Sequence, residues 1–343
     1  MSPDRRGLRP LVSSQIMATL RHRFGLVPTE ESVDLGGSSS LNLLLETSEG
    51  RYVVRVYRSH TSRSRLADMQ RVRRQLAAGG VPFPQSLLTK DGRRFVLVDG
   101  QLMEVERYVE HDANMDTWLR LETGLPYLGR THSLLQTTSV SAAGRHPPYA
   151  NHIEPEHALA GALRGVERIR SWNPTARELE LAEHSEELAH LVHEAERESM
   201  SSIRRQQVHG DFWDNNVLFR DGGVVLVTDL DFMGERLRTD DLALTLYFAN
   251  STLGGDRTSS ERIQQLRTLT DAYDSGLTER LSVAERRALP AAIARQPLWS
   301  IGGWVVNLQD AEEARLHAIS LTEDVKWTLS LMCNIEEWHE AFE

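Results

Sequence analysis

Short apolar and β-branched runs, separated by turn residues, fill the first third of the chain. They predict strands at residues 33–35, 41–46, 52–57, 94–98 and 101–109. Helical spacing over residues 64–78 ends at a Gly-Gly pair, and an earlier helical stripe, residues 15–24, ends at Gly25. We therefore predict an antiparallel sheet with one inserted helix over residues 30–110.

From residue 114 onward the apolar spacing is mostly helical. It predicts long helices at residues 117–136, 156–170 and 176–200, and further helices from Asp241 to the end. Short strands interrupt them at residues 207–208, 217–219 and 224–228. The predicted fold is α+β, with a five-stranded antiparallel sheet followed by a mainly helical lobe. We expect the small lobe to span residues 1–110 and the large lobe residues 111–343.

Composition narrows the class of protein. The 343 residues are too many for one average core and suit two lobes. No run approaches the ~18 apolar residues of a membrane span, and polar residues interrupt the run at 11–20, which makes a poor signal-peptide core. The single cysteine, Cys333, excludes an internal disulfide framework. We expect a cytoplasmic protein without a membrane partner.

The charge is divided unevenly along the sequence. Residues 1–110 hold 17 Lys and Arg against 12 Asp and Glu, whereas the rest hold 22 against 37. The acidic second part argues against nucleic acid as a partner and would attract a cationic small molecule. A solvated acidic surface is the alternative. Of the 39 basic residues only Lys90 and Lys326 are lysine.

One loop carries the strongest chemical signal. Its sequence is His209-Gly-Asp-Phe-Trp-Asp-Asn-Asn216. Phosphoryl transfer needs a carboxylate to orient the attacking hydroxyl and an oxygen ligand for a nearby Mg²⁺. The spacing of Asp211 and Asn216 is that of protein-kinase catalytic loops. A polar loop joining a helix and a strand is the alternative.

A second motif follows at a suitable distance. The sequence Leu226-Val-Thr-Asp-Leu-Asp-Phe232 ends a predicted strand in Asp229, a hard anionic ligand of the kind that Mg²⁺ prefers. Twelve residues later, Asp241 begins Asp-Leu-Ala at a predicted helix start, where a carboxylate is favoured. Together the two motifs indicate phosphoryl transfer more specifically than either does alone.

The combination HGDxxxxN, xxDxD and DLA resembles the aminoglycoside phosphotransferase and choline-kinase-like superfamily, which includes type II homoserine kinases. The resemblance extends over residues 33–250, and the last ninety residues match only as a helical lobe. It implies a bilobal protein-kinase-like fold that uses ATP and Mg²⁺. The implied reaction moves the γ-phosphate to a hydroxyl of a small molecule.

The resemblance also implies roles for single residues. Asp211 would be the catalytic base, and Asn216 and Asp229 would bind the metal. Asp231 would either assist the metal or face the substrate.

Other residues of the same loops receive supporting roles. His209 and Asp241 would brace the catalytic loop by hydrogen bonds. Trp213 and Asp214 flank the base and are candidates to contact the acceptor.

The small lobe holds the expected nucleotide contacts. A loop of small residues, which lets backbone N–H groups approach phosphates, consists of Gly36, Gly37, Ser38, Ser39 and Ser40. It is not GxGxxG, so a serine-rich hairpin turn is the alternative. By resemblance, the hinge that binds adenine through its backbone would include Arg107, Tyr108 and Val109.

Arginine replaces the lysine that protein kinases carry on the third strand. Arg55 stands at this position, and Lys90 lies in a turn from which it cannot substitute. Because arginine binds phosphate with two donors and stays charged, we interpret Arg55 as the phosphate contact; pairing with a surface acid is the alternative. The helix at 64–78 has no Glu, and whether its one acid, Asp68, pairs with Arg55 stays open.

The sequence also bears on the chemistry of the acceptor and on the alternative classes of protein. The acidic large lobe and the habits of the superfamily favour an amine-bearing acceptor: an aminoglycoside, another amino sugar, an amino alcohol or homoserine. Trp299 and Trp304 could add a cation–π contact, although a place in the helix core, among Leu298, Ile301 and Val305, is the favoured interpretation. The alternatives are a catalytically silent nucleotide-binding pseudokinase, a protein kinase, for which the loop lacks the Arg of HRD, and a metal hydrolase, which would need a second histidine.

Overall fold

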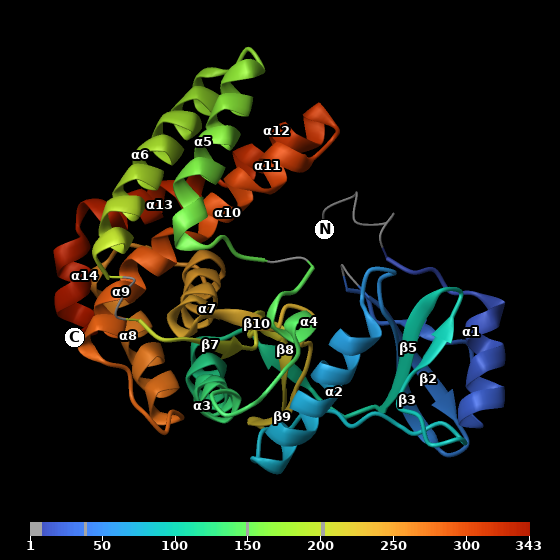
Figure 1. Ribbon diagram of the computed structural model, residues 1–343. Helices are drawn as coiled ribbons and strands as arrows, with labels where there is room; N and C mark the ends of the chain where they lie inside the picture. The colour runs from blue at the N-terminus through green and yellow to red at the C-terminus, as the bar shows by residue number, and fades with distance from the viewer. Residues whose placement is uncertain (1–8, 38–39, 149–150, 200–202) are drawn as a thin grey trace. The chain divides into compact units, whose positions relative to one another are not determined.

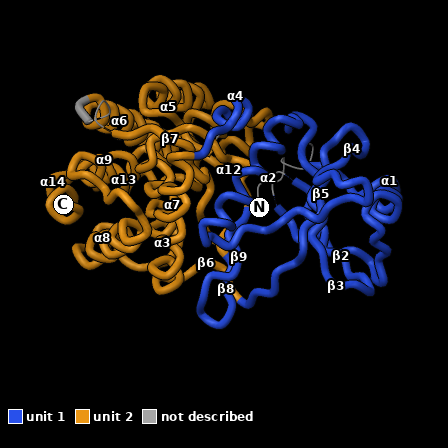
Figure 2. The backbone as a smooth tube through the Cα atoms, turned by 60° about the horizontal axis from the view of Figure 1, so that its bottom comes forward, with its two compact units in different colours: residues 1–112, 138–148, 218–228 blue, residues 113–137, 149–217, 229–343 orange. Residues whose placement is uncertain are grey.

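The computed structural model describes residues 9–37, 40–148, 151–199 and 203–343. The chain forms two compact units, coloured separately in Figure 2. The first consists of Met1–Asp112, Thr138–Pro148 and Leu218–Thr228, and the second of Ala113–Thr137, Tyr149–Val217 and Asp229–Glu343. Neither unit is continuous in sequence.

The first unit is built on the predicted five-stranded antiparallel sheet, whose strand order is β1-β2-β3-β5-β4. Its strands are β1 (Val33–Asp34), β2 (Leu41–Thr47), β3 (Gly50–Val56), β4 (Val96–Val98) and β5 (Gln101–Arg107). The prediction is confirmed, although β4 begins two residues later and β5 ends two residues earlier than the pattern indicated.

The two faces of this sheet pack against different helices. Leu43, Val54 and Val105, which are register partners, share one buried face with Leu20 from the helical stripe. That stripe folds as α1 (Ser14–Thr19) and the π-helix η2 (Leu20–Phe24). The opposite face receives the inserted helix α2 (Arg63–Ala78), whose Arg73 bonds to Glu104 of β5. Figure 1 shows α1 and α2 on opposite sides of the sheet.

Four shorter elements follow the five-stranded sheet along the chain. They are β6 (Ala113–Met115), α4 (Ala142–Arg145), β8 (Asp214–Arg220) and β9 (Gly223–Val227). β8 is the middle strand of a three-stranded sheet with β6 and β9, and the chain passes from the second unit to the first within β8. The sequence pattern predicted β8 and β9 but neither β6 nor α4.

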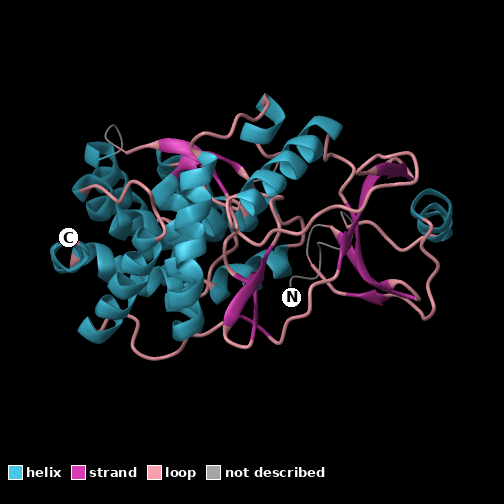
Figure 3. Ribbon diagram, turned by 90° about the horizontal axis from the view of Figure 1, so that it is seen from below, coloured by secondary structure: helices cyan, strands magenta, loops and turns pink. Residues whose placement is uncertain are grey.

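The second unit is mainly helical, as predicted (Figure 3). Its helices are α3 (Trp118–Leu135), α5 (Pro155–Ser171), α6 (Ala176–Ser199), α7 (Arg238–Thr252), α8 (Ser260–Ser275), α9 (Val283–Ala294), α10 (Gln296–Gly302), α11 (Trp304–Asn307), α12 (Ala311–Ser320), α13 (Thr322–Cys333) and α14 (Ile335–Phe342). The antiparallel pair β7 (Arg205–Val208) and β10 (Gly234–Leu237) lies among them. Within the described ranges, none of the helices is long and apolar enough to cross a membrane.

Glycines set how closely two of these helices approach. A Cβ on Gly129 of α3 would lie 2.2 Å from the carbonyl oxygen of Tyr273 in α8. A Cβ on Gly276, just after α8, would lie 2.0 Å from the carbonyl oxygen of Pro126 in α3. The backbones of α3 and α8 therefore touch, and this contact brings the Tyr273 hydroxyl within 2.8 Å of Nδ1 of His132 in α3.

Candidate active site

The predicted catalytic loop joins β7 to β8 in the second unit. Its turn depends on Gly210, which has a φ of +90°. A Cβ at this position would lie 2.2 Å from the carbonyl oxygen of Phe232. Only glycine fits both the left-handed backbone and this close approach, so the loop passes directly over the segment that follows Asp231.

The carboxylate of Asp211 is held from two sides. The side-chain amide of Asn216 donates to Oδ2 at 3.0 Å and to the Asp211 carbonyl oxygen at 2.8 Å. The side-chain amide of Asn151 donates to Oδ1 at 3.0 Å and to the Gly210 carbonyl oxygen at 2.7 Å. These bonds fix the orientation that a base needs toward an incoming hydroxyl.

The electrostatic surroundings of Asp211 set its protonation. Burial, together with the nearby negative charges of Asp229 and Asp241, raises the pKa of Asp211 to about 7. A carboxyl with this pKa can take up a proton near neutral pH. The same surplus of negative charge favours a cation beside Asp211.

The predicted metal ligands fit a Mg²⁺ ion by their chemistry. Asn216 uses its amide nitrogen on Asp211, which leaves its Oδ1 as the ligand atom, and Asp229 supplies a carboxylate. Asp229 follows β9 with a φ of +64°, and its Oδ1 accepts the backbone N–H of Asp231 at 2.9 Å. The described residues contain no group of three His, Cys, Asp or Glu that could hold a metal. One amide and one carboxylate are therefore a partial set, of the kind that phosphate and water oxygens complete around Mg²⁺.

The two residues predicted to brace the loop contact it directly. Both carboxylate oxygens of Asp241, in the first turn of α7, accept the backbone N–H of Gly210 at 3.0 and 3.1 Å. The Nδ1 of His209 lies 3.3 Å from the backbone N–H of Asp211, and the His209 ring meets Phe212 edge-on. Both side chains are fully buried.

Asp241 has a further partner that the sequence did not reveal. His132 of α3 places its Nε2 3.0 Å from Asp241 Oδ2 and its Nδ1 2.8 Å from the hydroxyl of Tyr273. Burial raises the pKa of Asp241, but the bond from His132 and its charge outweigh burial and lower the pKa to about 2. Asp241 therefore stays ionised as an acceptor for the loop.

The candidate acceptor contacts lie at the end of the same loop. The ring of Trp213 lies against Phe248 of α7, with a centroid separation of 4.8 Å. Asp214 begins β8 with a φ of +34°. Burial and the nearby charge of Asp116 raise the pKa of Asp214, so a cation beside it would relieve the repulsion.

Asn151 and Arg236 are further contributors to this site, besides His132, that sequence reasoning missed. The guanidinium of Arg236, in β10, donates to the side-chain oxygen of Asn151 at 3.1 Å and to the Phe232 carbonyl at 3.0 Å. Arg236 is 2% exposed. It therefore fixes the Asn151 side chain against Asp211.

Replacing Asn151 tests whether its bond to Asp211 operates in the working protein. Asn151→Ala removes one donor to the carboxylate, so the pKa of Asp211 should rise further. We expect the acid limb of the kcat/KM pH profile to move upward by about one pH unit. Asn334→Ala, which removes an exposed amide that donates to the Ser330 carbonyl, should leave the limb in place. An unshifted limb in Asn151→Ala would remove Asn151 from the site.

The structure describes both ends of the small-residue loop of the first unit. Gly36 and Gly37 have φ values of +84° and +105°, and the Gly36 carbonyl accepts the side-chain amide of Asn42 at 3.1 Å. Arg9 also reaches this loop and donates to the carbonyl oxygens of Gly36 and Ser40. The other two predicted loop contacts, Ser38 and Ser39, lie outside the described residues.

The predicted hinge follows β5 in the same unit. Arg107 ends β5, and the backbone N–H of Tyr108 donates to the Arg51 carbonyl at 3.0 Å. The Val109 carbonyl oxygen lies 2.9 Å from Nδ1 of His111. Because the Tyr108 N–H already donates to the Arg51 carbonyl, it is not available to adenine, and fewer backbone groups of the predicted hinge remain that could bind it.

Arg55 is buried on β3, with its guanidinium carbon 5.5 Å from the centre of the Tyr57 ring. Asp68 bonds to other partners than Arg55. Its carboxylate accepts the backbone N–H and hydroxyl of Ser141 and a bond from Arg71. Asp68 therefore ties α2 to the segment before α4.

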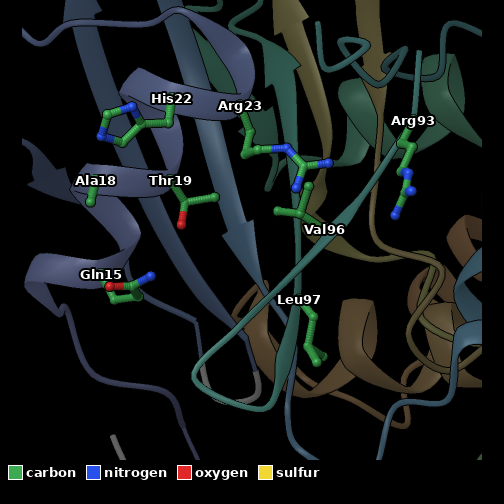
Figure 4. A pocket seen from close by; sticks show the side chains of 8 residues that line it. All are labelled: Gln15, Ala18, Thr19, His22, Arg23, Arg93, Val96 and Leu97. Carbon is green, nitrogen blue, oxygen red and sulfur yellow. The ribbon is translucent and has the colours of Figure 1, made fainter. Parts of the chain in front are cut away.

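Two other features, a pair of tryptophans and a surface pocket, contain none of the predicted catalytic, metal or nucleotide-binding residues. Trp299 and Trp304 are partly buried and meet edge-on, with centroids 6.2 Å apart, so they form part of the helical packing. A surface pocket of about 360 Å³ lies between the N-terminal helix and β4 (Figure 4). Its Arg23 and Arg93 both pair with Asp91, and none of its lining residues is a predicted site residue.

Comparison with known proteins places this geometry in a family. A family model described as "Phosphotransferase enzyme family" matches residues 32–281. No curated protein sequence matches the chain.

Solved structures share the fold. A microcompartment-associated aminopropanol kinase is 18% identical with a TM-score of 0.67, and the match covers 94% of this chain and 97% of that one. An amicoumacin kinase solved with AMP-PNP and Ca²⁺ is 13% identical with a TM-score of 0.64, covering 92% and 94%. An aminoglycoside phosphotransferase from Alicyclobacillus acidocaldarius is 15% identical with a TM-score of 0.62, covering 96% and 97%. These likenesses confirm the α+β kinase-like fold.

Proposed function

Because the chain belongs to the APH phosphotransferase enzyme family, we propose that it is an ATP- and Mg²⁺-dependent kinase that phosphorylates a hydroxyl of a small molecule. Residues 1–110 would bind the nucleotide, and residues 111–343 would hold the base and the acceptor. The proposal places the protein in the cytoplasm, with neither nucleic acid nor membrane as a partner. One observation carries it: the Asp211 carboxylate is fixed by two amides, with Asp229 nearby.

The residues suggest how the transfer proceeds. Asp211 accepts the proton of the acceptor hydroxyl as the hydroxyl oxygen attacks the γ-phosphorus of ATP. The bond from the γ-phosphorus to the β–γ bridging oxygen breaks, and ADP leaves. Asn151 and Asn216 keep the carboxylate aimed. Asn216 and Asp229 would hold Mg²⁺, which when bound neutralises charge on the phosphates. Asp231 would either assist the metal or face the substrate. Arg55 would bind the phosphates of ATP, together with the loop that starts at Gly36.

We assign an amine-bearing acceptor: an aminoglycoside, another amino sugar, an amino alcohol or homoserine. The surplus of 15 acidic residues beyond residue 110 supports this class, as do the names of the similar aminopropanol kinase and aminoglycoside phosphotransferase. Trp213 and Asp214 are the proposed contacts, because an ammonium group would relieve the repulsion between Asp214 and Asp116.

The test is ADP release from ATP with a panel of acceptors. The panel contains aminoglycosides, amino alcohols, homoserine, and neutral and anionic alcohols. Turnover with amine-bearing members alone supports the assignment, and turnover restricted to neutral or anionic alcohols contradicts it. Nucleotide binding without turnover on any member would favour the pseudokinase alternative.

The proposed metal role of Asp229 predicts a changed Mg²⁺ requirement. Asp229→Asn removes an anionic ligand, so the half-saturating Mg²⁺ concentration should rise at least about 10-fold, the loss that even outer partners of metal ligands cause. Chelation by EDTA should stop turnover of the unaltered protein. Asp221→Asn is the matched control, because Asp221 also has a positive φ but its side chain is 91% exposed. Equal Mg²⁺ requirements in the two variants would contradict the assignment.

A further inference from the structure

A buried ion cluster joins α2 to the sheet of the first unit. Arg73 of α2 donates to both carboxylate oxygens of Glu104 at 2.6 and 2.7 Å and also pairs with Glu106. The exposed fractions of Arg73, Glu104 and Glu106 are 4%, 0% and 5%. Protein kinases pair a strand lysine with a helix glutamate. Here the helix carries the cation and the strand carries the acid.

Glu104 is saturated by its partners. Its two oxygens accept bonds from Tyr57, Gln70, Ser86 and, twice, Arg73. A carboxylate offers about four lone-pair sites, so these donors occupy it completely. Burial raises the pKa of Glu104, but the charge of Arg73 and the bonds outweigh burial and lower it. Glu104 is therefore a fixed, ionised anchor.

The anchor lies beside the proposed phosphate contact. Glu104 and Arg55 are register partners on β5 and β3, so their side chains share the face toward α2. Tyr57 links them, because its hydroxyl donates to Glu104 and its ring lies 5.5 Å from the guanidinium carbon of Arg55. Tyr57 therefore contacts both Glu104 and Arg55.

We propose that Tyr57 and Glu104 are positioning residues for Arg55: Arg73 fixes Glu104, Glu104 fixes the Tyr57 hydroxyl, and the Tyr57 ring holds the guanidinium in place for the nucleotide phosphates. The inference rests on the proposed nucleotide-binding function. It assigns to a strand acid and a tyrosine the task that a helix glutamate performs in protein kinases.

The test is a double-mutant cycle on the affinity for AMP-PNP with Mg²⁺, measured by calorimetry. Arg55→Met should weaken binding about 10-fold or more. Tyr57→Phe keeps the ring but frees it from Glu104, and should weaken binding about 3- to 10-fold. In the Arg55→Met background Tyr57→Phe should have almost no further effect, because the group that it positions is gone. Glu104→Gln is the second probe and should show the same coupling to Arg55.

The control and the possible outcomes distinguish a failure of the proposed function from a failure of the positioning role alone. Tyr52→Phe alters a buried tyrosine of β3, the strand that Tyr57 follows, whose ring lies near Arg107, and it should leave affinity unchanged. If the unaltered protein does not bind AMP-PNP, the proposed function fails and the inference fails with it. If it binds and Arg55→Met weakens binding, but the effects of Tyr57→Phe and Glu104→Gln add to that of Arg55→Met, the positioning role alone is wrong.

Discussion

Asp211→Asn is expected to lower kcat by about 10²- to 10⁴-fold, the usual contribution of a positioned acid or base. The amide preserves the shape of the side chain, so AMP-PNP affinity should change little. The effect is measured as ADP release with the best acceptor of the panel. Asp221→Asn, in the exposed turn between β8 and β9, is the matched substitution and should retain full turnover. Unchanged turnover in Asp211→Asn would remove Asp211 from its catalytic role.

The same variant should also change stability in a defined pH window. The pKa of Asp211 is about 7 in the folded protein, against an ordinary value of 3.8. A carboxyl whose pKa is raised on folding costs stability as pH rises from the unfolded pKa to the folded pKa, and the full cost is present above the folded value. Without metal, Asp211→Asn should therefore unfold later than the unaltered protein at pH 8, with the difference vanishing near pH 4. A less stable variant at pH 8 would show that the loss of turnover reflects damage to the fold.

The contacts within the candidate catalytic loop could be predicted because its main parts lie close together in sequence. Asp211 and Asn216 are five residues apart and share hydrogen bonds, and Asp229 follows after one hairpin. Asp241 could be found because its carboxylate lies in the first turn of a helix. Residues that contact one another at such short separations form a motif that can be recognised in the sequence.

The supporting contacts could not be predicted because they join distant segments. His132 lies 109 residues from Asp241, and Asn151 lies 60 residues from Asp211. Neither residue belongs to a local motif, so only the packing of α3 and of the segment before α5 reveals them. The cluster around Arg73 was missed for a related reason, since an arginine in a charged helix reads as exposed unless its partners on another strand are known.

A second buried ion cluster joins segments that adjoin the candidate active site. Arg295, at the end of α9, donates to Glu196 of α6 at 2.8 Å and also bonds to Asp240 and to the Ile153 carbonyl. Arg295 is 1% exposed, and its two acid partners are at most 5% exposed. Asp240 precedes Asp241, and Ile153 follows Asn151 by two residues. The cluster therefore ties together both segments that hold the catalytic loop.

Arg295→Met is expected to lower the free energy of unfolding by about 3–5 kcal/mol at pH 8, because it leaves two buried carboxylates without their cation. Urea unfolding measures this loss. Burial already raises the pKa of Glu196 to about 7 against the pull of Arg295, and losing the cation raises it further. The folded variant can then bind protons that the unfolded chain releases above about pH 5, so the loss should be smaller at pH 5 than at pH 8.

Two further variants separate charge from packing in this cluster. Adding Glu196→Gln to Arg295→Met removes one stranded charge and should restore part of the lost stability. Arg287→Met breaks pairs of an arginine whose side chain is 53% exposed, and should cost less than about 1 kcal/mol. If Arg295→Met cost no more than Arg287→Met, or cost the same at both pH values, the buried charges would not hold these helices together. The support of Asn151 and Asp241 would then have to come from apolar packing alone.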